Sequence, residues 1–207
     1  MSATRDVTAQ PIGWSVTLPG SSVEVRFDRV DADRDAALVH DWMNRPHVSP
    51  WWELDRPYEQ IRDYLACLTH LWPWLVSTGG MPFGYVETYR VAEDPLADHI
   101  SARSDDLGWH VLVGPQDMLG TGAPRLMGRA VLAYLLNQSE RVVCEPDAKN
   151  ERMLAFCGRL GHRHLGEVEL PEKRAALMAC TREEFDAFWP DDRRAVHAAS
   201  MYEEAAR

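Results

Sequence analysis

His110 is the side chain in this sequence best suited to move a proton near neutral pH, because imidazole titrates in that range. It lies in an apolar segment, Leu107–Val113, that is typical of a buried strand. A turn containing Gly120 and Gly122 follows, and then a helix predicted over Ala123–Leu136. The first N–H groups of such a helix are free and its dipole favours negative charge. This order predicts that a pyrophosphate-bearing acyl carrier meets a nucleophile here.

A second group with chemical potential follows the next predicted strand, Arg141–Cys144, in the segment Glu-Pro-Asp-Ala-Lys-Asn. Asp147 in this segment could orient His110, share a proton with it, or bind the distal cation of a substrate. The alternative for Asp147 is a structural role as a turn former or helix cap, and Asn150 could likewise be a helix cap. The same ambiguity holds for His110, which could be a strand histidine that bonds only to the backbone.

The segment Arg45–Arg56 is predicted to be a loop, because it holds two prolines and no helical or strand period. His47, Trp51 and Trp52 lie in it, and aromatic walls suit an aliphatic diamine or an acyl chain. The alternative is that the two tryptophans attach the loop to the core. Glu87, on a strand next to the central one, could hold a cation or point into solvent.

The elements that must position these residues alternate between strands and helices. Strands are predicted at Trp14–Leu18, Val23–Phe27, Trp74–Ser77, Met81–Arg90, His162–Leu170 and Arg174–Thr181, with helices ending near Asn44 and Thr69 and spanning Glu151–Arg159 and Arg182–Trp189. This order predicts a single α/β domain over residues 1–189, with a mixed central sheet and helices on both faces. Residues 190–207, rich in charge and alanine, are predicted to be a tail with a loosely docked or disordered helix.

Composition limits the classes of partner. The 207 residues carry a net charge of −10, which argues against nucleic acid as a ligand. We find no apolar run long enough for a membrane span and no export signal at the N-terminus. The four cysteines form no CxxC pair, which predicts a cytoplasmic protein with free thiols, no disulfide framework and no metal. A monomer and a homodimer both stay open.

The order of elements, with a glycine turn after the central strand, resembles the GNAT acyl-CoA N-acyltransferases over about Val23–Trp189. The resemblance implies a GNAT fold and an acyl-CoA co-substrate, with acetyl-CoA or succinyl-CoA expected. The family shows a basic residue or Gln where this chain has Asp117, so the diphosphate contact that the resemblance implies here is made by backbone donors. The CoA contacts that the resemblance implies are Val111, Val113, Gln116, Gly120, Thr121, Gly122, Asn150 and Phe156.

Two groups within that fold share the segments Trp-Met-Asn-Arg-Pro-His-Val from Trp42 and Pro-Phe-Gly-Tyr-Val-Glu from Pro82. They are the aminoglycoside 6′-N-acetyltransferases and the siderophore-pathway acyltransferases that act on hydroxylysine, lysine or hydroxycadaverine. The aminoglycoside enzymes carry Asp where this chain has His110, whereas the siderophore group has the His and a Glu-Pro-Asp-x-x-Asn segment. This chain therefore resembles the siderophore group.

The siderophore resemblance implies that an acyl group passes directly to the terminal amine, N-hydroxylated or free, of a small lysine- or cadaverine-like diamine. His110 would be the general base and Asp147 its catalytic partner, without an acyl-enzyme, because Cys144 and Cys157 are expected to be buried and inert. The expected substrate contacts are His47, Trp51, Trp52, Glu87 and Trp109. The alternatives are an aminoglycoside acetyltransferase and a CoA-binding module without chemistry.

Overall fold

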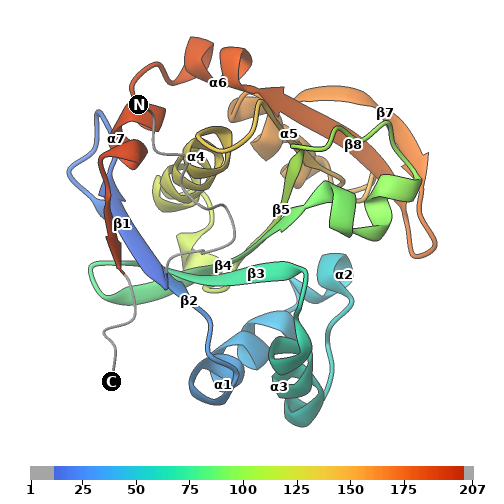
Figure 1. Ribbon diagram of the computed structural model, residues 1–207. Coiled ribbons are helices and arrows are strands. Elements are labelled where there is room, and N and C mark those ends of the chain that lie inside the picture. The colour runs from blue at the N-terminus through green and yellow to red at the C-terminus, as the bar shows by residue number, and fades with distance from the viewer. Residues whose placement is uncertain (1–11, 203–207) are drawn as a thin grey trace.

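A computed structural model describes residues 12–202, and its centre is one nine-stranded sheet with the order β7-β8-β6-β5-β4-β3-β2-β1-β9 (Figure 1). Only β5 and β6 are parallel, so the sheet is mixed, as predicted. The strands are β1 (Gly13–Thr17), β2 (Glu24–Arg29), β3 (Leu71–Thr78), β4 (Met81–Arg90), β5 (Leu107–Val113), β6 (Arg141–Cys144), β7 (Arg163–Glu169), β8 (Arg174–Thr181) and β9 (Ser200–Tyr202).

Helices cover both faces of this sheet, which confirms the predicted fold class (Figure 1). On one face, α1 (Ala32–Met43) packs beside α3 (Tyr58–Cys67), and the Asp31 side chain caps α1 by accepting from the N–H groups of Asp33 and Arg34. On the other face lies α4 (Ala123–Leu136), with eleven buried residues. The helix α5 (Glu151–Arg159) follows β6. No helix of the described residues is long and apolar enough to cross a membrane.

The parallel pair β5–β6 is short, and this positions the site. Leu107 and Gly108 pair with Val142 and Val143, and no further pair continues the ladder. On its other edge, β5 pairs with β4 from Leu107 through Val113. The last five residues of β5 therefore lack a strand partner on the β6 side, and the two strands bound an opening that side chains must line.

Two segments differ from the predictions. The loop predicted at residues 45–56 contains a short helix, α2 (Ser49–Trp52), which ends at Glu53 in a left-handed conformation with a φ of 53°. In the tail predicted at residues 190–207 a helix does form, but the loose docking is wrong for the part that the structure describes, because α7 (Asp192–His197) packs on α4 and β9 joins the sheet beside β1. The physical reason is a buried ion pair, in which Arg129 Nε lies 2.8 Å from Asp192 Oδ2. Residues 203–207 lie outside the described residues.

The short helix α6 (Arg182–Phe188) forms as predicted, and its capping box explains why it begins where it does. The Thr181 hydroxyl accepts from the Glu184 N–H, while the Glu184 carboxylate accepts from the Thr181 N–H. The remaining helical segments are the 3-10 turns η1 (Val91–Glu93), η2 (Pro95–Asp98) and η3 (Gln116–Met118).

Candidate active site

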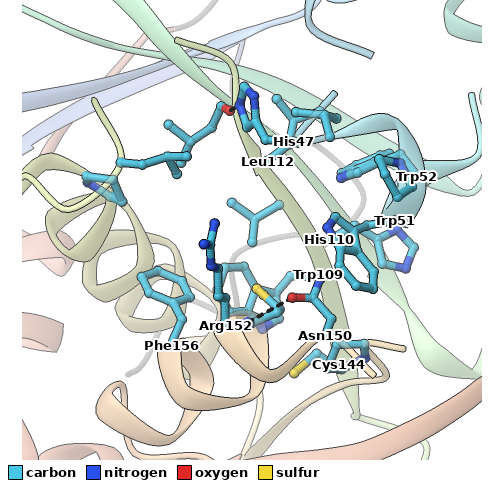
Figure 2. Close-up of a pocket in the computed structure, with 18 of the residues that line it drawn as sticks. His47, Trp51, Trp52, Trp109, His110, Leu112, Cys144, Asn150, Arg152 and Phe156 are labelled. Atoms are coloured by element: carbon cyan, nitrogen blue, oxygen red, sulfur yellow. Dashed lines mark hydrogen bonds between the residues drawn. The ribbon is translucent and has the colours of Figure 1, made fainter. Parts of the chain in front are cut away.

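A cleft of about 1480 Å³ occupies the opening between β5 and β6. Its walls come from the segment around α2, from β5, from the residues after β6, and from α5. Figure 2 shows Trp51, Trp52 and His110 on one side of this cleft, and Phe156 and Arg152 on the other. The cleft is long and has two differing ends: aromatic residues and carboxylates at the end beside His110, and the glycine turn before α4 at the opposite end.

His110 bridges two carboxylates in this cleft. Its Nδ1 lies 3.0 Å from Glu87 Oε2, on the neighbouring strand β4, and its Nε2 lies 3.0 Å from Glu145 Oε1, directly after β6. The register explains the first contact, because Glu87 and His110 are directly paired across the two strands. The His110 side chain is 30% exposed and faces the cleft, whereas both carboxylates are buried.

Three tyrosines complete the arrangement by donating to the two carboxylates. The hydroxyls of Tyr64 and Tyr85 donate to Glu87 Oε1 at 2.5 and 2.7 Å. The hydroxyl of Tyr89 donates to Glu145 Oε2 at 2.9 Å. We call these six residues the His110 cluster: Tyr64, Tyr85, Glu87, Tyr89, His110 and Glu145. Buried carboxylates need such donors, because an unpaired buried charge is costly.

The charges of the His110 cluster follow from these contacts. Burial alone would lower the pKa of His110, but the attraction and hydrogen bonds of Glu145 and Glu87 outweigh it and raise the pKa to about 10. Burial alone would likewise raise the pKa of Glu145, yet the charge and hydrogen bond of His110, helped by Lys173 and Tyr89, lower it to about 2. Both shifts favour the charged form of each group, an imidazolium beside a carboxylate.

The relationship of this chain to known proteins agrees with the geometry. The family model described as "Acetyltransferase (GNAT) domain" matches residues 31–170. The chain belongs to the GNAT acetyltransferase family. It is thus an acyl-CoA-dependent acyltransferase, as its resemblance to this family predicted.

Curated relatives indicate the group of acyltransferases to which this chain is similar. It is 34% identical over 158 residues to an N-hydroxyputrescine acetyltransferase of Acinetobacter baumannii, covering 73% of this chain and 75% of that one. It is 32% identical over 157 residues to the lysine N-acyltransferase MbtK of Mycobacterium tuberculosis, covering 73% and 75%. These relatives confirm the resemblance to acyltransferases of the siderophore type.

Solved structures share the fold of this GNAT protein. An uncharacterized protein from Bacillus halodurans superposes with a TM-score of 0.84 and 28% identity, covering 91% of this chain and 100% of that one. The aminoglycoside acetyltransferase AAC(6')-Ib, in complex with coenzyme A and kanamycin, superposes with a TM-score of 0.71 and 21% identity, covering 79% and 98%. At that identity the second likeness shows the fold alone.

The acyltransferase does not pair His110 with Asp147 in this structure. Asp147 Oδ1 accepts from the Lys149 N–H at 2.7 Å, and Asp147 forms an isolated bridge with Ala175 of β8. Asn150 caps α5, its Oδ1 accepting from the Met153 N–H at 3.1 Å, although it also lines the cleft. In the structure, the Asp147 side chain therefore stabilises a turn and the Asn150 side chain caps a helix. Glu145 occupies the position beside His110 that was expected of Asp147.

The segment between α1 and α3 forms part of the cleft wall, and its residues differ in role. His47 Nε2 lies 3.0 Å from the Val113 carbonyl, and the Arg45 guanidinium donates to the Gly114 carbonyl at 2.8 Å, so both hold this segment against the end of β5. Trp52 meets the His110 ring edge to face, with centroids 6.1 Å apart. Trp51 is 42% exposed at the cleft, more than a tryptophan that only fills the core.

Trp109 lies on the opposite face of β5 from His110, because side chains alternate along a strand. It is 1% exposed, and its indole stacks on His162 with centroids 5.9 Å apart, so that only a small part of it reaches the cleft. Burial lowers the pKa of His162 to about 4, which keeps this histidine neutral.

The glycine turn has the donors expected of an anion site. Gly120 has a φ of 79°, a conformation that L side chains rarely adopt. Among residues 12–202, no partner occupies the backbone N–H of Gly120, Gly122 or Arg125. The Thr121 hydroxyl is used within the turn, since it donates to the Met118 carbonyl at 2.8 Å. The backbone, rather than Thr121, is therefore the part of this turn that can receive phosphate.

Sequence reasoning missed several cleft residues. Glu145 directly follows β6, and the ends of parallel strands meet at one edge of a sheet, so its position relative to β5 was a usable signal. Arg152 and Arg159 lie seven residues apart on α5, hence on one face, with Phe156 between them. Lys173, in the β7–β8 turn, lies 3.6 Å from Glu145 Oε1, and no local pattern points to it.

No group of three or more His, Cys, Asp or Glu side chains in the described residues is arranged to hold a metal ion. Cys144 and Cys157 are both buried, as predicted, with their sulfur atoms 3.6 Å apart. The contact with Cys157 and burial raise the pKa of the Cys144 thiol, which disfavours the nucleophilic thiolate.

Proposed function

We propose that this enzyme transfers an acyl group from acyl-CoA to the terminal nitrogen of a lysine- or cadaverine-like diamine, N-hydroxylated or free, in the synthesis of a hydroxamate siderophore. The observation that carries the proposal is the position of His110, whose ring faces the cleft where β5 and β6 separate. The names of the relatives, N-hydroxyputrescine acetyltransferase and lysine N-acyltransferase, support the class of acceptor.

The diphosphate of acetyl-CoA or succinyl-CoA would lie at the turn before α4. The free N–H groups of Gly120, Gly122 and Arg125, at the positive end of a fourteen-residue helix, support this placement. Arg152 and Arg159 line the same cleft and form no ion pair within the described residues, so they can face the phosphates. Gln116 is a polar side chain of the turn region that lines the cleft, beside the apolar side chain of Leu119.

The pantetheine arm would follow the free edge of β5. The Gly114 N–H donates to the Phe83 carbonyl and therefore points toward β4. Because backbone groups alternate in direction along a strand, those of Val113 and Val111 point into the cleft. His47 already occupies the Val113 carbonyl, which leaves its N–H and both groups of Val111 for the arm. Phe156 would contact the arm from α5.

The acceptor would enter at the end of the cleft beside the His110 cluster. Trp51 and Trp52 from α2 and Tyr64 from α3 line this end, and their apolar surfaces suit the carbon chain of a diamine. Glu87 was expected to bind a substrate cation, but its carboxylate is already engaged by His110 and two tyrosines. The wall of this subsite is therefore largely aromatic.

The reaction would be a direct attack in a ternary complex. The acceptor nitrogen attacks the thioester carbon, the C–S bond breaks, and backbone N–H groups of β5 hold the carbonyl oxygen as charge develops on it. The family resemblance implies that His110 is a general base, and this role would have a cost. With a pKa of about 10, removing the proton at pH 7 costs about 4 kcal/mol.

The test is a thiol-release assay with acetyl-CoA and succinyl-CoA against N-hydroxylysine, N-hydroxycadaverine, lysine and kanamycin. We expect thiol release with a hydroxylated amine, and a loss of at least about 100-fold in kcat/KM in His110→Ala. His70→Gln, at a half-exposed histidine outside the cleft, is the matched control and should retain activity. Release with kanamycin alone, or with no amine, would contradict the proposal.

A further inference from the structure

Every oxygen of the two carboxylates around His110 faces a donor. Glu87 Oε1 accepts from Tyr64 and Tyr85, and its Oε2 meets His110 Nδ1. Glu145 Oε2 accepts from Tyr89, and its Oε1 meets His110 Nε2, with Lys173 Nζ 3.6 Å away. Each of the four carboxylate oxygens therefore faces a donor, and both ring nitrogens of His110 are committed to a carboxylate, so neither nitrogen is free to act as a base toward a substrate.

The same geometry determines the protonation of the ring. A neutral imidazole has one N–H and one lone pair, so it can donate to one carboxylate only. With both ring nitrogens 3.0 Å from a carboxylate oxygen, a neutral ring would point its lone pair at a negative charge. Two donors are needed, and the imidazolium has them. Glu87 and Glu145 together thus bind the charged form of His110.

We propose that Glu87 and Glu145 are positioning residues that keep His110 protonated during acyl transfer, so that the ring acts as a fixed positive charge and the acceptor nitrogen must arrive neutral. The inference deepens the proposed function and rests on it. It assigns to His110 a role opposite to that of a general base, which would need a free lone pair.

The chemistry balances without a protein base. The lone pair of a neutral nitrogen forms the N–C bond, and the electrons of the C–S bond pass to sulfur. The proton on nitrogen then passes to the departing thiolate, giving the free thiol of CoA. Negative charge develops on the carbonyl oxygen and then on sulfur, and the imidazolium offsets the charges of Glu87 and Glu145, which would otherwise repel it. An alkylammonium acceptor would first have to lose a proton, and neither ring nitrogen of His110 is free to take it.

The surroundings of the ring agree with this assignment. The charged and titratable groups that face it are Glu87 and Tyr89 from β4, Glu145 after β6, and Lys173 from the β7–β8 turn. Tyr64 of α3 and Tyr85 of β4 lie behind Glu87 and stabilise its charge. The residue packed on the ring from α2 is Trp52, which carries no charge. The balance of attraction and burial raises the pKa of His110.

The direct test is an NMR titration of the histidine ring signals in the full-length protein, with the His110 signal assigned by its absence in His110→Gln. In the parent protein we expect the imidazolium signal to persist from pH 6 to about 9. In Glu145→Gln the ring loses one charge partner, and its titration midpoint should fall to about pH 7. Glu172→Gln, which changes a cleft residue outside the His110 cluster, is the matched control and should leave the midpoint unchanged.

Either of two results would overturn the inference: a parent His110 that titrates near its ordinary pKa of about 6.5, or a midpoint that Glu145→Gln does not move. The parent titration decides the matter even where the variant does not fold. These readouts need no turnover, so they are independent of the proposed function. If the protein releases no thiol with any amine but His110 stays charged, the proposed function is wrong and the positioning role of Glu87 and Glu145 still holds.

The rate offers a second readout. With an N-hydroxylated acceptor, which is neutral at pH 7, kcat/KM should be nearly flat from about pH 7 to 9, because no enzyme group must lose a proton. With the corresponding amine that lacks the hydroxyl group, kcat/KM should rise about tenfold per pH unit at pH values below the amine's pKa of about 10.4. A rise with both acceptors that follows one shared midpoint near pH 6.5 would instead identify His110 as a base.

Discussion

Tyr89 donates a hydrogen bond to Glu145 across the backbone of Gly108. The two residues are 56 positions apart, and their side-chain oxygens lie 2.9 Å apart. Tyr89 and Gly108 are paired across β4 and β5, and a Cβ atom on Gly108 would lie 2.2 Å from the tyrosine ring. The missing side chain at Gly108 is therefore what lets the phenol cross β5 and reach the carboxylate that holds His110.

Substituting Gly108→Ala should displace Tyr89 and break this hydrogen bond. We expect a loss of about 1–3 kcal/mol in the free energy of unfolding, measured by urea denaturation, because the added methyl overlaps a buried ring. Gly158→Ala in α5 is the matched control. No atom lies within 4 Å of the added methyl there, so this helix should keep or gain up to about 1 kcal/mol. Equal stability of the two variants would show that Tyr89 has another path to Glu145.

The stability of the protein should depend on pH through the His110 cluster. The pKa of His110 rises on folding from 6.5 to about 10, so its contribution is complete below pH 6.5 and is lost as pH rises toward 10. The pKa of Glu145 falls from 4.5 to about 2, so its contribution is complete above pH 4.5 and is lost as pH falls toward 2. Urea denaturation at about pH 6 and pH 9 should show the parent less stable at the higher pH.

The variant that isolates this effect is His110→Gln, which should lose most of the alkaline decline. His70→Gln should keep it, because His70 is 40% exposed and lies 3.5 Å from a single carboxylate, that of Asp94. A His110→Gln protein that declines as steeply as the parent would assign the alkaline loss to other groups.

The buried pair between Arg129 and Asp192 should anchor the C-terminal helix α7 to α4. Asp192→Ala leaves a charge that is 9% exposed without its partner, at an expected cost of about 3–5 kcal/mol in the free energy of unfolding. Asp191→Ala removes the carboxylate of an exposed pair with Arg194 and should cost less than about 1 kcal/mol. Similar costs for the two variants would mean that α7 adds nothing through this contact.

Arg152 should contribute to the binding of acyl-CoA. It projects from α5 into the cleft in Figure 2. The substitution Arg152→Gln would remove a charge-assisted hydrogen bond to a phosphate of acyl-CoA. We expect the KM for acyl-CoA to rise about tenfold at saturating acceptor, with the KM for the acceptor unchanged. Arg194→Gln, at a side chain that is 84% exposed outside the cleft, should change neither. A rise confined to the KM of the acceptor would place Arg152 in the acceptor subsite instead.

Local patterns in the sequence were enough for much of the fold. The helix Ala123–Leu136 and the strands Arg141–Cys144 and Arg174–Thr181 have the predicted bounds, because a helical period, a turn or a buried run is encoded over neighbouring residues. The mixed sheet followed from the order of those elements. The helix in the C-terminal segment was predicted but its firm docking was not, since a charged, alanine-rich stretch contains no sign of the ion pair between Arg129 and Asp192 that docks it.

The sequence by itself determined that His110 lies on a central strand ahead of a glycine turn, and family resemblance made that histidine a candidate for chemistry. Only the tertiary structure decided its partners. Glu87 meets it through strand register, Glu145 through the meeting of two parallel strand ends, and Tyr64 through the packing of α3. Such contacts join residues 23 to 35 positions apart, and their distances depend on how whole elements pack, which no local pattern records.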